Sequence, residues 1–239
     1  MSGAGSGAKG KQKPVVIVQA RMGSSRLPGK VLADLCGQPV LGWLLDRVRR
    51  SVEAQGAMVA TTTAPEDDPV EELAANLGVA CFRGHPTDVL ARFAGASKQA
   101  KADSIARISG DSPLIDAQTV DAVIEDFRRG GADLVENHRE VGWPMGTAVE
   151  VMSRGCLERL DRETADPVHR EHVTLYAYEN GSGVRTRHVP PPEALRAPEL
   201  RLCVDTAGDL ERVRGICARF APRRDFSVAE IVASGVAAA

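Results

Sequence analysis

Small and cationic side chains are concentrated in one loop near the start of the chain. An apolar run of strand type at residues 15–18 leads into this loop, within the stretch VVIVQARMGSSRLPGK at residues 15–30. The small residues are Ala20, Gly23, Ser24 and Ser25, and the cations are Arg21, Arg26 and Lys30. Small residues let backbone N–H groups approach an anion, and fixed cations neutralise it. The loop is therefore predicted to bind a polyphosphate.

Two aspartates further along the chain each follow an apolar run. Asp111 lies in ISGDSPLI at residues 108–115, and Asp205 lies in LCVDTAGDL at residues 202–210. At the end of a strand, a carboxylate can coordinate Mg²⁺ that is also bound by phosphate oxygens. Most loop aspartates instead form turns or cap helices, so neither motif is specific alone. Together with the cationic loop, they predict a site in which two carboxylates, one Mg²⁺ and one polyphosphate neutralise one another.

Strand and helix patterns alternate along the first half of the chain. Strands are expected at residues 15–18, 57–61, 79–82, 104–108 and 132–135. Helices are expected to include residues 41–48, 66–77, 88–100 and 116–129, with Thr87 and Asp116 capping the last two. This order predicts an α/β fold: a Rossmann-like, mostly parallel sheet with helices on both faces. Ligands of such sheets bind beyond the carboxyl ends of the strands, where the loops after residues 18 and 108 lie.

The regular alternation of strand and helix patterns ends at about residue 136. Residues 137–199 predict a small α+β insertion on the acceptor side of the crevice, with strands at 148–152 and 184–189 and helices at 153–162 and 167–178. A strand at 200–204, a helix at 207–220 and a short helix begun by a Ser227/Glu230 capping box follow. Residues 1–14 are rich in Gly, Ser and Lys and predict a flexible tail, which leaves residues 15–239 as one domain.

Composition excludes several classes of function. The 239 residues carry 30 basic and 32 acidic side chains, so a net charge of -2 gives no support to nucleic-acid or membrane-surface binding. No apolar run reaches the roughly 20 residues that cross a bilayer. The five cysteines are scattered without a C-x-x-C pair, which favours free thiols in a reducing cytoplasm over disulfides or a zinc site.

Four motifs together resemble the cytidylyltransferase family: VQARMGSSRLPGKVL, RISGDSPLID, EHVTLY and VDTAGDLERV. The closest group is the spore-coat polysaccharide type, which is related to the enzymes that activate acylneuraminate and 3-deoxy-manno-octulosonate as CMP-sugars. The similarity spans residues 15 to about 219. It implies a nucleotide-diphospho-sugar transferase-like fold, Mg²⁺ as cofactor, and attack of an acceptor oxygen on the α-phosphorus of CTP with release of pyrophosphate. It also makes a homodimer plausible, with the insertion as the contact.

The resemblance implies a role for each matching residue of the nucleotide site. Arg21 and Lys30 match triphosphate-binding cations and, with Asp111, form the expected catalytic set. Asp111 and Asp205 match the two Mg²⁺-binding aspartates. The remaining expected nucleotide contacts are Ala20, Gly23, Ser24, Ser25, Arg26, Arg83 and Ser109. For Arg83, which follows the third strand, a solvated surface arginine is an equal alternative.

The acceptor side departs from the family pattern. The spore-coat group commonly carries Asp-Gly-x-Asp-x-Glu, where this chain has Met145-Gly-Thr-Ala148-Val-Glu150. The expected acceptor-binding residues are Trp143, Gly146, Glu150, Arg170 and His172. Packing of the insertion is the alternative for Trp143, and a polar helical turn is the alternative for residues 169–172.

The acceptor is expected to be a small anion: a sugar acid, a phosphosugar or a phosphonate. A phosphate or phosphonate is already an oxyanion and needs no general base, whereas a sugar hydroxyl must lose a proton. Two alternatives remain. A phosphate-binding loop does not read the base, so another nucleoside triphosphate could be the donor. A catalytically decayed nucleotide-binding homologue would also fit the lost carboxylates, although the retained cations and aspartates argue against it.

Overall fold

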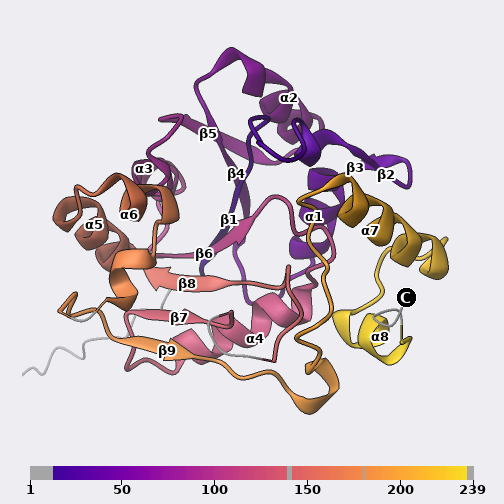
Figure 1. Ribbon diagram of the computed structural model, residues 1–239. Helices are drawn as coiled ribbons and strands as arrows, with labels where there is room; N and C mark the ends of the chain where they lie inside the picture. Colours follow the sequence, from indigo (N-terminus) through magenta and orange to yellow (C-terminus); the bar gives the residue numbers. More distant parts are fainter. Residues whose placement is uncertain (1–12, 139–141, 180, 236–239) are drawn as a thin grey trace, which may run out of the picture.

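The computed structural model describes residues 13–138, 142–179 and 181–235 (Figure 1). The predicted tail therefore lies almost wholly outside the described residues. A seven-stranded sheet with the order β5-β4-β1-β6-β8-β7-β9 forms the centre of the molecule. In the parallel part are β1 (Val15–Gln19), β4 (Gly56–Thr62), β5 (Ala80–Gly84) and β6 (Ser104–Ser109). The predicted Rossmann-like, mostly parallel sheet is confirmed.

The second half of the chain adds strands to the same sheet. Strand β8 (Glu150–Ser153) runs antiparallel to both β6 and β7 (Leu134–Glu136), and β9 (Thr186–His188) pairs parallel with β7. Two strands of the expected insertion at residues 137–199 thus belong to the central sheet. A separate two-stranded hairpin joins β2 (Asp34–Leu35) and β3 (Gln38–Pro39).

Helices cover both faces of the sheet because successive strand residues point to opposite sides. Val16 and Val18 pack in one cluster with α1 (Val40–Val48), α2 (Asp68–Asn76) and α4 (Ala117–Arg128). Ile17 packs in the other cluster with α3 (Val89–Gln99) and α5 (Arg154–Glu163), which lie to the left in Figure 1. The remaining helices are α6 (Pro167–His172), α7 (Ala207–Phe220) and α8 (Val228–Ala233). The last two pack in a third cluster around Trp43 and Phe226.

Four local predictions can be compared with these elements. Asp116 caps α4 by accepting from Thr119 N, as expected, and the Ser227/Glu230 capping box begins α8. The prediction of Thr87 as the cap of α3 is wrong, because the Asp88 side chain accepts from Ala91 N instead. The helix predicted at 167–178 is two pieces, α6 and the 3₁₀ helix η3 (Leu175–Tyr178), divided at Val173 with its φ of 56°.

The strand predicted at residues 200–204 is not formed. This stretch makes only an isolated bridge with Met145, and its N–H groups bond to loops: Leu202 N donates to Met145 O, and Val204 N donates to Asp111 O. The apolar run of Leu202 and Val204 is buried against α7 and α8 rather than in the sheet.

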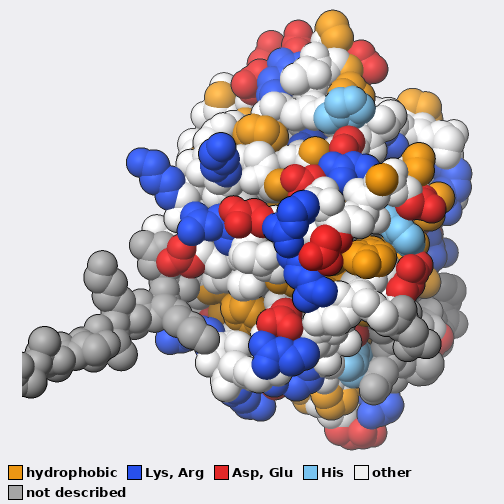
Figure 2. Space-filling view, turned by 90° about the vertical axis from the view of Figure 1, so that its left-hand side faces the viewer, with side chains coloured by type: hydrophobic (Ala, Val, Ile, Leu, Met, Phe, Trp, Pro, Cys, Tyr) orange, Lys and Arg blue, Asp and Glu red, His pale blue; other side chains and the backbone are white. Residues whose placement is uncertain are grey.

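Charges of both signs are interspersed on the face that carries α5 and α6 (Figure 2). Among the described residues, no helix combines the length and the apolar character needed to cross a membrane.

Candidate active site

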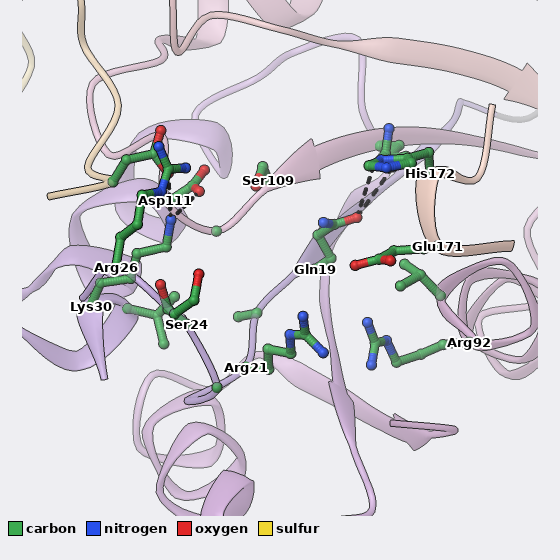
Figure 3. A pocket seen from close by; sticks show the side chains of 18 residues that line it. Gln19, Arg21, Ser24, Arg26, Lys30, Arg92, Ser109, Asp111, Glu171 and His172 are labelled. Atoms are coloured by element: carbon green, nitrogen blue, oxygen red, sulfur yellow. Dashed lines mark hydrogen bonds and ion pairs between the residues drawn. The ribbon is translucent and has the colours of Figure 1, made fainter. Parts of the chain in front are cut away.

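A cavity of about 390 Å³ lies at the carboxyl ends of β1 and β6 (Figure 3). From β1 the chain proceeds to β4 and β5 on one side, and β6 then pairs on the other side of β1. This reversal of direction is where α/β sheets bind ligands. The cavity is lined by Gln19, Ala20, Arg21, Gly23, Ser24, Ser25, Arg26, Lys30, Val31, Val89, Arg92, Arg107, Ser109, Gly110, Asp111, Glu171, His172 and Asp205. Of the eleven residues predicted for the nucleotide and the metal, only Arg83 is missing from this wall.

Lys30 joins the two aspartates. Its Nζ lies 2.5 Å from Asp111 Oδ2 and 2.9 Å from Asp205 Oδ1, and Arg26 Nη2 lies 2.9 Å from the same Asp205 oxygen. Burial alone would raise the pKa of Asp205, but the hydrogen bond and charge of Lys30, with Arg26 and Arg201, hold that pKa below its usual value. Burial would likewise lower the pKa of Lys30, and the two carboxylates more than reverse this. The structure therefore brings together residues that are far apart in the sequence.

Close backbone contacts set the positions of Lys30 and Asp111. Gly29 has a φ of 73° and donates from its N–H to Met22 O at 2.9 Å, which closes the cationic loop just before η1 (Lys30–Leu32). Gly110 donates to Gln19 O at 2.8 Å, and a Cβ at this position would lie 2.6 Å from the same oxygen. Only glycine lets the loops after β1 and β6 approach this closely. The glycine of the Gly-Asp motif thus brings Asp111 beside the cationic loop.

Asp205 is available to Lys30 because other residues begin α7. Thr206 accepts from Asp209 N, and Asp209 Oδ2 accepts from the backbone N–H of Thr206 and of Asp205. Thr206, and not Asp205, is therefore the cap of α7. The second oxygen of Asp205 pairs with Arg201 Nη2 at 2.6 Å. The helix start fixes the backbone of Asp205 while its side chain faces the cavity.

The residues fit a divalent cation that keeps part of its own coordination shell. The described residues contain no group of three or more His, Cys, Asp or Glu side chains that could hold a metal ion. Asp111 and Asp205 supply two carboxylates that lie close enough to bind one cation, since both accept from the Lys30 ammonium. Mg²⁺ commonly takes one or two carboxylates and completes its octahedron with phosphate oxygens and water. The pair suits such an ion when a phosphate is bound.

Arg83 lies outside the cavity. Its guanidinium donates to Thr62 O and Ala64 O and pairs with Asp68 at 2.6 Å and Glu71 at 3.0 Å. These partners belong to the β4–α2 connection and α2, so Arg83 stabilises a neighbouring turn. Arg83 is thus a half-buried, ion-paired arginine rather than a solvated one, and it does not line the cavity at which the other nucleotide residues meet.

A second polar cavity of about 380 Å³ adjoins the first. Arg107 and His172 line both cavities, and Glu150 lines the second. The other residues of its wall are His138, Val168, Thr174, Leu175 and Tyr178. Two of the predicted acceptor residues, Glu150 and His172, thus meet beside the nucleotide-sized cavity.

Glu150 is buried in a dense polar network. Its carboxylate forms an ion pair with Arg107 and accepts hydrogen bonds from Thr174 Oγ1 at 2.6 Å and Tyr178 OH at 2.8 Å. Burial alone would raise the pKa of Glu150. The charges of Arg107 and His138 and the hydrogen bonds from Thr174 and Arg107 outweigh this effect, so the pKa lies below its ordinary value and the carboxylate is ionised. Arg107 also donates to Gln19 Oε1 at 3.1 Å, which links the network to β1.

The other three predicted acceptor residues lie elsewhere. Trp143 and Gly146 line a third cavity, of about 510 Å³, that shares His138 with the cavity of Glu150 but does not contain Arg107 or His172. Trp143 Nε1 donates to Val189 O at 2.8 Å, and a Cβ on Gly146 would lie 2.6 Å from Cys203 N. These contacts agree with the packing alternative for Trp143, and acceptor contacts of Trp143 and Gly146 stay predictions. Arg170 lines none of the three cavities; it pairs with Asp88 at 2.6 Å and Asp161 at 2.7 Å and so joins α6 to α3 and α5.

Sequence reasoning missed Gln19, Arg92, Arg107 and Glu171 in the first cavity. Arg107 interrupts the apolar run of β6, and Arg92 stands among the apolar residues of α3. A charged residue at a buried position was the available signal, because such a group needs a partner or a ligand.

Comparison with known proteins agrees with this site. A cytidylyltransferase family model matches residues 15–224. The spore coat polysaccharide biosynthesis protein SpsF of Bacillus subtilis is 33% identical over 221 residues, covering 90% of this chain and 91% of that protein. The structure of a cytidylyltransferase from Leptospira borgpetersenii has a TM-score of 0.87 and 31% identity, with 93% of each chain covered.

A more distant structure shares the fold. It is a CMP:2-keto-3-deoxy-manno-octonic acid synthetase complexed with CTP, with a TM-score of 0.66, 21% identity, and coverage of 87% of this chain and 99% of that one. The family model spans most of the chain, and it includes the cationic loop and both aspartates. The chain belongs to the cytidylyltransferase family and is a CTP-dependent nucleotidyltransferase.

Proposed function

We propose that this enzyme transfers CMP from CTP to a small anionic acceptor, releases pyrophosphate and uses Mg²⁺. The observation that carries the proposal is the ammonium of Lys30 between Asp111 and Asp205, at a cavity lined by the small and cationic residues of the first loop. A triphosphate bound there would form an ion pair with the Lys30 ammonium in place of Asp111 and Asp205. The two carboxylates would then be free to bind the metal ion.

The first loop supplies the contacts for the triphosphate. Arg21, Arg26 and Lys30 offer positive charge, and Ser24, Ser25 and Ser109 offer hydroxyl groups at the same cavity. Such groups stabilise phosphoryl transfer mainly by holding the reactants in place and by balancing charge, without a covalent intermediate. Mg²⁺ held by Asp111 and Asp205 would supply further neutralisation of phosphate oxygens. Positive side chains also stabilise the pyrophosphate that leaves.

The acceptor is proposed to enter the cavity that holds Glu150 and His138. This cavity meets the nucleotide cavity at Arg107 and His172, so an acceptor oxygen in it could face the α-phosphoryl group. The names of the relatives include a polysaccharide biosynthesis protein and a sugar-acid synthetase. We therefore infer that the acceptor is a sugar acid, a phosphosugar or a phosphonate.

A homodimer in the cytoplasm is part of the same proposal. Met145 and Val168, both within residues 137–199, are large hydrophobic side chains that are 50% and 54% exposed. These side chains would be covered if that segment formed the contact. Light scattering coupled to gel filtration would report twice the chain mass; a monomer at micromolar concentration would contradict the dimer.

One experiment tests the reaction. The protein is incubated with Mg²⁺, one of the four common nucleoside triphosphates, and a panel of sugar acids, phosphosugars and aminoalkyl phosphonates. Pyrophosphate is measured enzymatically and products by mass spectrometry. Pyrophosphate released only with CTP, matched by a CMP-acceptor product and abolished by EDTA, supports the proposal. Equal turnover of another triphosphate, or CTP binding without turnover of any acceptor, would overturn it.

A further inference from the structure

Two arginines lie together on the wall of the nucleotide cavity, away from Lys30 (Figure 3). Arg21 comes from the first loop and Arg92 from the first turn of α3. Arg92 Nη1 donates to His85 O at 3.1 Å, and Arg21 Nη1 lies 3.4 Å from Pro86 O. Their guanidinium groups therefore converge on one short backbone segment before α3.

Arg92 is an unusual buried cation. Arg92 is only 3% exposed, and its Nε has no hydrogen-bond partner. In the described part of the chain, no carboxylate oxygen lies within 4.0 Å, the limit for an ion pair, of a guanidinium nitrogen of Arg21 or Arg92. Glu171 lines the same cavity, yet it makes no such pair with them. Burial and the neighbouring charge of Arg21 lower the pKa of Arg92 to about 10, although the more distant charges of Asp67 and Asp88 act in the opposite direction.

This arrangement is costly unless a ligand compensates for it. A buried charge without a counter-ion is strongly unfavourable, and a second charge of the same sign adds to the cost. The carbonyl of His85 satisfies part of the Arg92 guanidinium but not the Nε–H or the charge. An oxyanion between the two arginines would supply both a counter-charge and the missing acceptor.

We propose that Arg92 is a further polyphosphate-binding residue, outside the first loop, which acts with Arg21 to hold the β- and γ-phosphoryl groups of CTP and then the pyrophosphate. This inference rests on the proposed function. The reacting α-phosphoryl group has to face the acceptor cavity, whose residues in common with the nucleotide cavity are Arg107 and His172. Arg21 and Arg92 line the nucleotide cavity only, so they are assigned to the part of the triphosphate that leaves.

The test compares three ligands that differ in their phosphates. Binding of CTP, CMP and pyrophosphate, each with Mg²⁺, is measured by calorimetry for the wild type, Arg92→Gln and Arg92→Lys. Arg50→Gln is the matched control, because Arg50 is a surface residue of the turn after α1 that pairs with Asp46. Circular dichroism and thermal unfolding show whether each variant is folded.

Arg92→Gln is expected to bind CTP and pyrophosphate about 10- to 100-fold more weakly, the effect of losing one charged hydrogen-bonding partner, with CMP affinity unchanged. Arg92→Lys is expected to lie between Gln and wild type, since it keeps a charge but loses the planar fork. Arg50→Gln should match the wild type for all three ligands.

Unchanged affinity of Arg92→Gln for CTP and pyrophosphate would overturn the inference. So would an equal loss for CMP, because that is the result of a purely structural role. If Arg92→Gln does not fold, Arg92→Lys carries the test: weaker pyrophosphate binding at unchanged CMP binding supports the inference, and parallel values overturn it. Failure of the wild type to bind CTP would instead contradict the proposed function.

Discussion

The two ends of the nucleotide cavity hold their cations in different ways. At one end Lys30 is paired with Asp111 and Asp205, and Arg26 shares the second carboxylate. At the other end Arg21 and Arg92 have no carboxylate within ion-pair distance among the described residues. A paired cation must exchange partners when a phosphate and its metal ion arrive. Arg21 and Arg92 would at that moment gain an anion at ion-pair distance, in addition to the more distant charges of Asp67 and Asp88.

This difference separates stability from binding. The paired end is balanced without ligand, so removing one member leaves the others unbalanced even in the free protein. The unpaired end is unfavourable without ligand, so removing Arg92 relieves repulsion in the free protein while weakening the bound state. Variants at the two ends are therefore expected to move unfolding and affinity in different combinations.

The largest expected effect is at the paired end. Lys30→Ala and Asp111→Asn should each lower kcat/KM for CTP by about 100- to 1,000-fold, as loss of one preorganised charge typically does. Initial rates of pyrophosphate release measure this. Arg128→Gln, which removes a surface partner of Glu53, provides the control. Turnover near the wild-type rate in either site variant would show that the converged charges do not act on the triphosphate.

For stability rather than activity, the largest expected effect is at the ion pair of Arg107 with Glu150, between the two cavities. Glu150→Gln leaves Arg107 without its carboxylate partner in a buried network, which is expected to cost about 3 to 5 kcal/mol of unfolding free energy. Urea denaturation at pH 7 measures this loss. A change below about 1 kcal/mol would mean that Arg107 finds another partner, and the contrast with Arg92 would then disappear.

The pH dependence of the unfolding free energy of the same variant tests whether Glu150 is ionised in the folded protein. The folded-state pKa of Glu150 lies below the ordinary value of 4.5, so ionised Glu150 stabilises the folded protein above that value. The contribution is lost as pH falls through the folded-state pKa. The difference in unfolding free energy between wild type and Glu150→Gln should thus be constant near neutral pH and shrink below about pH 4.5. A difference that grows with acid would contradict this.

The paired end could be predicted from the sequence because its parts are local motifs: the loop after β1, Asp111 after β6, and Asp205 before α7, although the strand expected before Asp205 is not formed. The topology of a parallel sheet brings the loops after β1 and β6 to one edge, so the first loop and Asp111 were expected to meet. At the unpaired end Arg21 was expected, but Arg92 was not. An arginine among the apolar residues of α3 is a signal of burial, yet the sequence alone does not show whether its side chain reaches solvent. Its environment depends on residues 85 and 86, whose backbone conformation no motif fixes.

Arg83 and Arg170 show the opposite error. Each was expected at the site because of its neighbours in sequence, yet each pairs with two carboxylates supplied by other elements. Similarly, residues 200–204 have the apolar character of a strand, but their hydrogen bonds go to Met145 and Asp111. Contacts between distant segments decide all three cases.

A smaller effect is expected from two glycines of the site. Gly110→Ala places a Cβ 2.6 Å from Gln19 O and 3.0 Å from Ala20 Cβ, so the loops must separate at a cost of about 1 to 3 kcal/mol. Gly23→Ala meets no protein atom within 4 Å and should leave stability unchanged. Weaker CTP binding in Gly23→Ala would then report the close approach of the ligand itself. Urea unfolding and calorimetry measure the pair, and a stable Gly110→Ala with normal CTP affinity would show that the loops tolerate separation.

The smallest expected effect concerns two capping boxes. Thr206→Ala and Ser227→Ala each remove the N-cap hydroxyl of a helix, and each is expected to cost about 1 kcal/mol of unfolding free energy. The two differ in what lies beside them. Thr206 follows Asp205 directly, so a loosened start of α7 also loosens one carboxylate of the paired end. Neither neighbour of Ser227 in the sequence lines any of the three cavities. Thr206→Ala should therefore weaken CTP binding in Mg²⁺ several-fold at a stability equal to that of Ser227→Ala. Equal CTP affinities in the two variants would show that Lys30, Arg26 and Arg201 hold Asp205 in place without the helix cap.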